Sequence, residues 1–173
     1  MLDCQIAILE NAIARYLSKN EIPGPMGSRH PSIAPFEAFK TKDSYIIIAA
    51  GNDKLFTKLC DVLKIPETAN DERFNSNSLR CENMDHLKEI FEKQLSSKST
   101  DEWVKEMEEL KIPCGPIFNI KQAVENPQIQ ERNMIVKSYH KIIGEFKSAG
   151  NPIKMSTYKD ESTRGNIPDL DEH

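Results

Sequence analysis

The run Tyr45–Ala50 is the most apolar stretch of the sequence, and it constrains the fold more than any other segment. It is short, it contains three isoleucines, whose β-branched side chains suit a strand, and Gly51 ends it. These features predict a buried β-strand. Asn52 follows directly and is well placed to cap a helix, because its side-chain oxygen can accept a hydrogen bond from the first turn. The sequence therefore predicts a strand that leads into a helix.

Apolar residues recur at helical spacing in several segments after this strand. Ser99 and Glu102 match a capping box, which marks the start of one of these helices. The predicted helices are 52–64, 83–96, 100–110, 120–125 and 127–132, with a single helical turn near 71–74, and the predicted strands are 44–50, 117–118, 134–139 and 145–149. Beyond Met155 the chain is polar and is expected to run over a surface. This pattern predicts the α+β class, a small mixed domain with a short β-sheet and several amphipathic helices.

The first segment, residues 2–18, has neither glycine nor proline and predicts a helix. Its apolar residues cover most of the circumference instead of one stripe, which is typical of a helix buried inside a larger body. Residues 19–43 then form a long connection without expected secondary structure. Connections of this length are usually functional segments or inter-domain linkers. We therefore expect a small domain to begin at the strand 44–50.

Charge and cysteine content argue against several function classes. The net charge of −4 and the pI of about 5.6 provide no concentrated basic field, so we expect no nucleic-acid or membrane partner. The longest apolar run is far shorter than the roughly 20 residues that cross a bilayer. The four cysteines are too widely spaced for a zinc site or a dense disulfide framework, so we expect reduced thiols and no metal site. Cys114 has no neighbouring base, which favours a structural thiol over a nucleophile.

Several short motifs occur in a fixed order along the chain. They are Gly27-x-x-His30-Pro31-x-x-x-Pro35-Phe36, Asp43-x-Tyr45, Gly51-Asn52-Asp53, Pro113-Cys114-Gly115-Pro116-Ile117 and Gly150-Asn151-Pro152-Ile153. Together they resemble the family III CoA-transferases, the group that includes formyl-CoA and carnitine CoA-transferases. The resemblance covers nearly the whole chain, but only the C-terminal portion of such an enzyme.

The resemblance implies an α/β large domain that is missing at the N-terminal side of this chain. It assigns 1–43 to a large-domain helix and an inter-domain linker, 44–140 to a small α+β domain, and 141–173 to a segment that returns toward the large domain. In the family, an aspartate of the large domain attacks the acyl-CoA thioester, and an aspartyl-CoA thioester follows. The catalytic residue is therefore expected outside this chain. Coenzyme A is implied as a thioester substrate, with no further cofactor.

The resemblance also implies a substrate-binding loop and a set of partners. Gly27, Ser28, Arg29 and His30 would lie in a mobile loop that covers the thioester; the competing interpretation is a linker in which His30 caps a turn. The implied partners are an acyl-CoA, a carboxylic acid and a second copy of the full-length enzyme in a homodimer. The expected location is the cytoplasm, or the mitochondrial matrix in a eukaryote.

Two other functions stay open. A 2-methylacyl-CoA racemase-like enzyme would carry an acidic residue soon after the strand. The corresponding segment here is Gly51-Asn52-Asp53, which favours a transferase unless the alignment shifts by one residue and brings Asp53 to that position. A stand-alone binding or dimerisation module without catalysis is the other alternative. The apolar helix over 2–18 argues against it, because a free-standing module should not expose such a surface.

Overall fold

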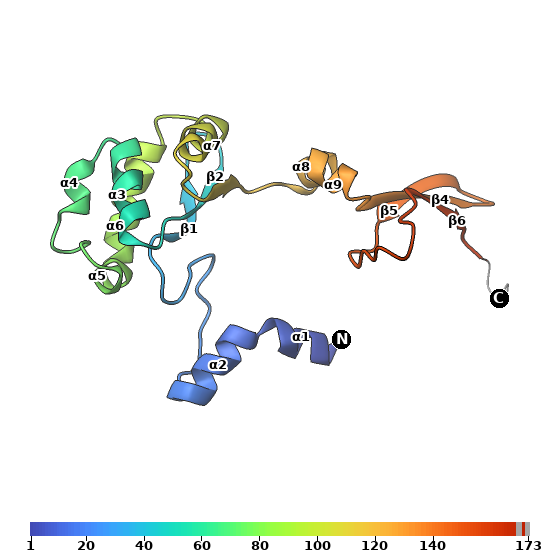
Figure 1. The fold of residues 1–173 in the computed structure, drawn as a ribbon, viewed down its shortest axis with the longest axis horizontal. Coiled ribbons are helices and arrows are strands. Elements are labelled where there is room, and N and C mark those ends of the chain that lie inside the picture. Colours follow the sequence, from blue (N-terminus) through green and yellow to red (C-terminus); the bar gives the residue numbers. More distant parts are fainter. Residues whose placement is uncertain (169–170, 172–173) are drawn as a thin grey trace. The chain divides into compact units, whose positions relative to one another are not determined.

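The structure is a computed structural model that describes residues 1–168 and 171 (Figure 1). The chain divides into two compact units, residues 1–117 and 118–173. The helices of the first unit are α1 (Leu2–Ile8), α2 (Glu10–Lys19), α3 (Asp53–Val62), α4 (Pro66–Ala69), α5 (Asn77–Glu82), α6 (Met84–Leu95) and α7 (Thr100–Glu109). Its strands are β1 (Phe36–Lys40), β2 (Tyr45–Ala49) and β3 (Cys114–Pro116). None of the helices within residues 1–168 is long and apolar enough to cross a membrane.

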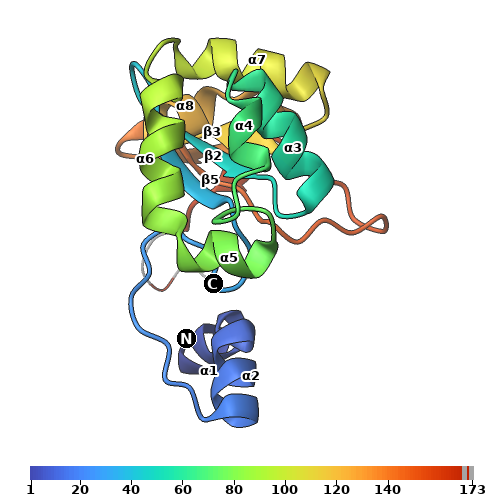
Figure 2. The same cartoon turned by 90° about the vertical axis from the view of Figure 1, so that its left-hand side faces the viewer.

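The core of the first unit lies between a three-stranded antiparallel sheet and the helices α3, α6 and α7, which cover one of its faces (Figure 2). The predicted strand is confirmed as β2, the central strand. Its Ile46 and Ile48 are fully buried, and Ile46 lies opposite Phe39 of β1. The Phe39 ring packs against Phe91 of α6 at 5.8 Å between ring centroids. Burial of each such side chain stabilises the fold by about 2 kcal/mol.

The two predicted helix starts are confirmed. The Asn52 side chain accepts a hydrogen bond of 2.9 Å from the Leu55 N–H at the start of α3. The capping box of α7 is complete, because Ser99 Oγ accepts from the Glu102 N–H while the Glu102 carboxylate accepts from the Ser99 N–H. Such caps satisfy donors that a helix leaves unpaired at its first turn.

Strand β1 lies in the segment 19–43, for which no secondary structure was predicted, so that prediction was wrong. The inward face of β1 carries Glu37 and Phe39, both buried. A carboxylate at an inward position hides the apolar alternation by which a strand is recognised in sequence. Pairing with β2 forms the strand nonetheless, with Phe36 opposite Ala49 and Lys40 opposite Tyr45.

Other elements also differ from the sequence expectations. The short strand predicted at 117–118 lies instead at 114–116, where it pairs with β2. Helix α5 was not predicted, because its one buried residue is Arg80 and it therefore has no apolar stripe. The predicted helix 2–18 is two helices that meet at Leu9, and none of their residues is buried. Its burial inside a larger body stays a prediction.

The second unit contains a small sheet of its own. Its elements are α8 (Ile120–Glu125), α9 (Pro127–Glu131), β4 (Ile135–His140), β5 (Gly144–Ala149) and β6 (Thr163–Asn166). The predicted hairpin of β4 and β5 is confirmed as an antiparallel pair, and β6, which was not predicted, runs parallel to β4. Asp160 accepts hydrogen bonds from Lys154 (2.5 Å) and Arg164 (2.7 Å), and these bonds lower its pKa to about 2.

The compact units divide the chain differently from the predicted domain boundaries. The boundary expected after residue 43 falls between β1 and β2, which pair along their whole length. The boundary expected after residue 140 falls between β4 and β5, which also pair. Main-chain hydrogen bonds thus join residues on either side of both expected boundaries, whereas the division between the two compact units falls between residues 117 and 118.

The glycine of the Gly150-Asn151-Pro152-Ile153 motif lies where the backbone passes very close to Asn133. Its N–H donates to the Met134 carbonyl oxygen at 2.8 Å, and a Cβ at Gly150 would lie 2.2 Å from the Asn133 carbonyl oxygen. We expect Gly150→Ala to destabilise the second unit by about 1–3 kcal/mol, because a backbone atom must move. Gly165→Ala is the matched control, since a Cβ there meets nothing within 4 Å. Amide hydrogen exchange in β4 and β5 measures both, and equal exchange in the two variants would contradict this account.

Candidate functional site

The loop 26–35 folds back onto β1. Gly27 takes a positive φ of 64°, which glycine adopts without a steric penalty. The Ser28 hydroxyl accepts a hydrogen bond of 3.0 Å from the Ala38 N–H, and the His30 N–H donates to the Phe36 carbonyl oxygen at 2.9 Å. The predicted site residues therefore lie in an anchored segment of the first unit.

Arg29 makes two ion pairs of different character. Its Nε donates to Glu37 Oε1 at 2.9 Å, and its Nη2 donates to Asp85 Oδ1 at 2.7 Å. Glu37 is buried and also pairs with the Lys88 ammonium at 2.5 Å, whereas the Asp85 side chain is 90% exposed. Burial by itself lowers the pKa of Arg29, but the hydrogen bonds to Asp85 and Glu37 outweigh it and the net shift is upward. The hydrogen bond from Arg29 in turn lowers the pKa of Asp85.

His30 shows features of both interpretations of its role. Its Nδ1 accepts a hydrogen bond of 3.2 Å from the Ser32 N–H, as a turn-capping histidine does, and its ring stacks on Phe36 at 5.2 Å. A neutral imidazole that accepts at Nδ1 carries its proton on Nε2, so Nε2 is a donor. His30 also lines a cavity.

The cavity has a volume of about 140 Å³ and lies between the loop and the helices α5 and α6. Arg29 and His30 line it, but Gly27 and Ser28 do not. The remaining lining residues are Met26, Pro31, Ile33 and Ala34 of the loop, with Cys81 and Met84 from the helices. The site thus combines two hydrogen-bond donors with a mostly apolar wall.

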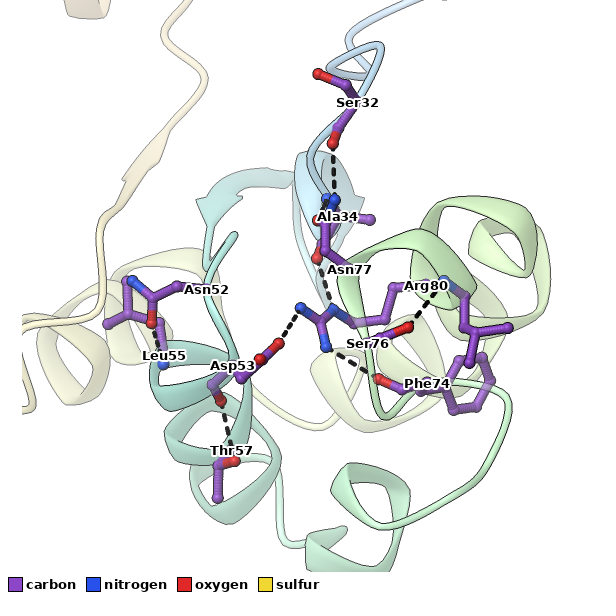
Figure 3. Close-up of polar contacts among 11 residues, drawn as sticks. Ser32, Ala34, Asn52, Asp53, Leu55, Thr57, Phe74, Ser76, Asn77 and Arg80 are labelled. Carbon is purple, nitrogen blue, oxygen red and sulfur yellow. Dashed lines mark hydrogen bonds and ion pairs between the residues drawn. The ribbon is translucent and has the colours of Figure 1, made fainter.

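Helix α5 holds the second half of the loop through two polar side chains (Figure 3). Asn77 donates to the Ser32 carbonyl oxygen at 2.8 Å and accepts from the Ala34 N–H at 3.0 Å. Arg80, which is fully buried, donates from Nε to the Ala34 carbonyl oxygen at 2.9 Å. Both main-chain groups of Ala34 are therefore satisfied by α5, and this fixes the wall of the cavity at that point.

The guanidinium of Arg80 also reaches two other segments. Its Nη1 donates to the Phe74 carbonyl oxygen at 3.0 Å, and its Nη2 donates to the Asp53 carboxylate at 2.7 Å (Figure 3). The group lies over the Phe56 ring, 4.5 Å from its centroid. Sequence reasoning missed Arg80, Asn77 and Glu37, because no local spacing marks a polar residue whose partners are distant in the chain.

Among the described residues, the other candidates from the sequence show no arrangement that supports a catalytic or metal-binding role. Cys114 is half-buried, and burial raises the pKa of its thiol, which disfavours a nucleophilic thiolate. One oxygen of the Asp53 carboxylate, Oδ1, accepts a hydrogen bond from Arg80. Within residues 1–168 and 171 no three His, Cys, Asp or Glu side chains are grouped so as to hold a metal ion.

Comparison with known families matches residues 1–173 to CoA-transferase family III. The chain belongs to that family. It is 38% identical over 172 residues to an acetyl-CoA:oxalate CoA-transferase of Acetobacter aceti, and the aligned region covers 99% of this chain and 43% of that enzyme. It is 31% identical over 164 residues to the human succinyl-CoA:glutarate CoA-transferase, and the aligned region covers 95% of this chain and 37% of that enzyme.

The fold is likewise that of the family. A CaiB/BaiF family protein from Brucella suis superimposes on this CoA-transferase family III chain with a TM-score of 0.79 and 33% identity, over 99% of this chain and 44% of that one. The resemblance found in the sequence and the predicted α+β class are both confirmed. The chain spans about two fifths of the length of the curated relatives it matches.

We expect Arg80→Met to lower the free energy of unfolding of the full chain by about 3 kcal/mol or more, because the Ala34 and Phe74 carbonyl oxygens lose their donor. The free energy of unfolding of Arg80→Lys should lie between those of Arg80→Met and the wild type, because one ammonium group cannot make all three contacts of the guanidinium. Urea unfolding followed by fluorescence of the buried Trp103 measures this.

Arg73→Met is the matched control for Arg80→Met. Arg73 also pairs with a carboxylate, Asp71, at 2.7 Å and lies over a phenylalanine ring, but its side chain is 51% exposed. Exposed ion pairs contribute little to stability, so we expect this variant to unfold nearly as the wild type does. Equal losses in the two variants would show that Arg80 has no special role.

Proposed function

We propose that this chain is the C-terminal portion of a family III CoA-transferase that moves CoA between an acyl-CoA and a carboxylic acid. One observation carries the proposal: the whole chain matches about two fifths of enzymes that are named for such a reaction. The remaining part of the enzyme, an α/β large domain, would lie outside this chain.

The proposed chemistry uses an aspartate of that large domain as the nucleophile. Its carboxylate attacks the thioester carbonyl, and CoA leaves as a thiolate, so that a mixed anhydride forms. The thiolate then attacks the aspartyl carbonyl of the anhydride, which releases the first carboxylic acid and leaves an aspartyl-CoA thioester. The incoming acid reverses these steps. Coenzyme A is a substrate in this scheme, and no further cofactor takes part.

This chain would supply part of the cover over the reacting thioester. An aspartyl thioester is open to hydrolysis, so the site needs a wall that excludes water. Residues Gly27, Ser28, Arg29 and His30 are proposed as that substrate-binding loop. Support comes from the anchoring of the loop on β1 and α5, and from the cavity that Arg29 and His30 line.

The carboxylic acid is proposed to be a dicarboxylic acid. Oxalate and glutarate, for which the two relatives are named, each carry two carboxylates. Only one of them reacts, and the other needs a cationic or hydrogen-bonding partner when water is excluded. Arg29 and His30 provide such groups on the cavity wall.

The racemase-like alternative is less well supported. It needs an acidic side chain soon after β2 that is available to the substrate, whereas Oδ1 of Asp53 accepts a hydrogen bond of 2.7 Å from the buried Arg80. The proposal also includes a homodimer of the full-length enzyme and a location in the cytoplasm, or in the mitochondrial matrix of a eukaryote.

A chimera tests this function. We expect the pure 173-residue chain to catalyse no transfer of CoA from acetyl-CoA or succinyl-CoA to oxalate or glutarate, because the nucleophile is absent. A chimera in which this chain replaces the matching 43% of the Acetobacter aceti enzyme should transfer CoA. Substitution of the nucleophilic aspartate in the N-terminal part should abolish that activity.

Two results would overturn the proposal. Turnover by the pure chain that is lost on substitution of one of its own carboxylates would place the nucleophile here. A folded chimera without activity would instead favour a binding or dimerisation module that has lost catalysis.

A further inference from the structure

We infer that Arg29 is a carboxylate-binding residue of the substrate cavity, and that Asp85 occupies its outer nitrogen when no ligand is bound. The ligand class is a short dicarboxylic acid, whose non-reacting carboxylate would replace Asp85 on Arg29. The role in substrate choice depends on the transferase function proposed above, whereas the binding itself does not.

The two ion pairs of Arg29 are not equivalent. Glu37 is 2% exposed and is held from its other oxygen by Lys88, which also donates to the Ala38 carbonyl oxygen at 3.0 Å. Breaking the Arg29–Glu37 pair would leave a buried carboxylate short of a partner, which is costly. Asp85 is 90% exposed, so its carboxylate can leave Arg29 and be solvated by water. The inner pair is therefore fixed, and the outer pair is exchangeable.

Exchange of one carboxylate for another costs little at this position. An exposed ion pair adds little to the stability of a protein, so Asp85 is a weak competitor. A ligand carboxylate would restore the hydrogen bond at Nη2, because guanidinium nitrogens form a fork that matches carboxylate oxygens. The charges agree with this. Arg29 and Lys88 balance Glu37 and Asp85, so when Asp85 withdraws one positive charge remains, which a single carboxylate neutralises.

The cavity beside Arg29 suits a small acid with a short carbon chain. Its volume of about 140 Å³ is close to the roughly 150 Å³ that holds a benzene molecule in another protein. Met26, Ile33 and Met84 provide apolar surface for methylene groups. The His30 side chain is a second polar group on the same wall. A monocarboxylic acid whose only carboxylate reacts cannot replace Asp85 on Arg29, so it gains no binding energy from that residue.

The experiment is a titration of the full 173-residue chain with glutarate, followed by nuclear magnetic resonance of the Arg29 side-chain Nε–H and the His30 backbone N–H. We expect Asp85→Asn to bind glutarate about two- to fivefold more tightly than the wild type, because the internal competitor is gone. Arg29→Gln should abolish the response at the His30 N–H. Asp71→Asn, which removes an exposed partner of a different arginine, is the control and should leave binding unchanged.

If the Arg29–Asp85 pair has a purely structural role, Asp85→Asn should not bind glutarate more tightly than the wild type. Binding that is weaker than wild type or unchanged in Asp85→Asn, or intact in Arg29→Gln, would overturn the inference. The Asp85→Asn result decides the question even if Arg29→Gln fails to fold, because Asp85 is exposed and its substitution leaves the buried Glu37 paired.

The chimera described above separates this inference from the proposed function. In an active chimera, Asp85→Asn should lower KM for glutarate and leave KM for butyrate, which has a single carboxylate, unchanged. Equal changes in KM for both acids would show that Arg29 has no role in substrate choice. Tighter glutarate binding by the Asp85→Asn chain alongside an inactive chimera would keep the carboxylate site and reject the transferase function.

Discussion

The buried guanidinium of Arg80 is the interaction on which the first unit depends. It joins the Ala34 carbonyl oxygen of the loop, the Phe74 carbonyl oxygen before α5 and the Asp53 carboxylate at the start of α3. A buried cation needs hydrogen-bond acceptors; each of the three nitrogens of Arg80 has one, and the Phe56 ring covers one face of the group. Because Ala34 lies on the cavity wall, the same contact that stabilises the fold also fixes the shape of the candidate site.

The sequence reveals those parts of this structure that depend on local patterns. Strand β2 and the helices α3, α6 and α7 follow from apolar spacing and from caps within four residues of the helix start. Strand β1 and helix α5 do not, because each buries a charged residue, Glu37 or Arg80, where an apolar one would be expected. Their burial is stable only because of partners elsewhere in the chain, and single-sequence patterns carry no information about such partners.

The residues of the candidate site also differ in whether a local sequence pattern reveals them. Arg29 and His30 could be singled out, since His30 belongs to a motif of the family and Arg29 lies within its span. Asn77, Arg80 and Asp85 could not, because they meet the loop across separations of 43, 46 and 56 residues. These distant partners also change the interpretation of the loop. A segment that sequence analysis described as a mobile cover is anchored by main-chain and side-chain hydrogen bonds at Ser28, His30 and Ala34.

We expect residues 26–35 to form a fixed wall of the cavity and not a linker. Amide hydrogen exchange of the full chain, measured at the N–H groups of His30 and Ala34, distinguishes the two. Their acceptors are the Phe36 carbonyl oxygen and the Asn77 side chain, so both should exchange slowly, at rates like that of the Ala50 N–H, which donates to Pro35 beside β2. Exchange of both groups at the rate of an unstructured peptide, with Ala50 still protected, would contradict the account.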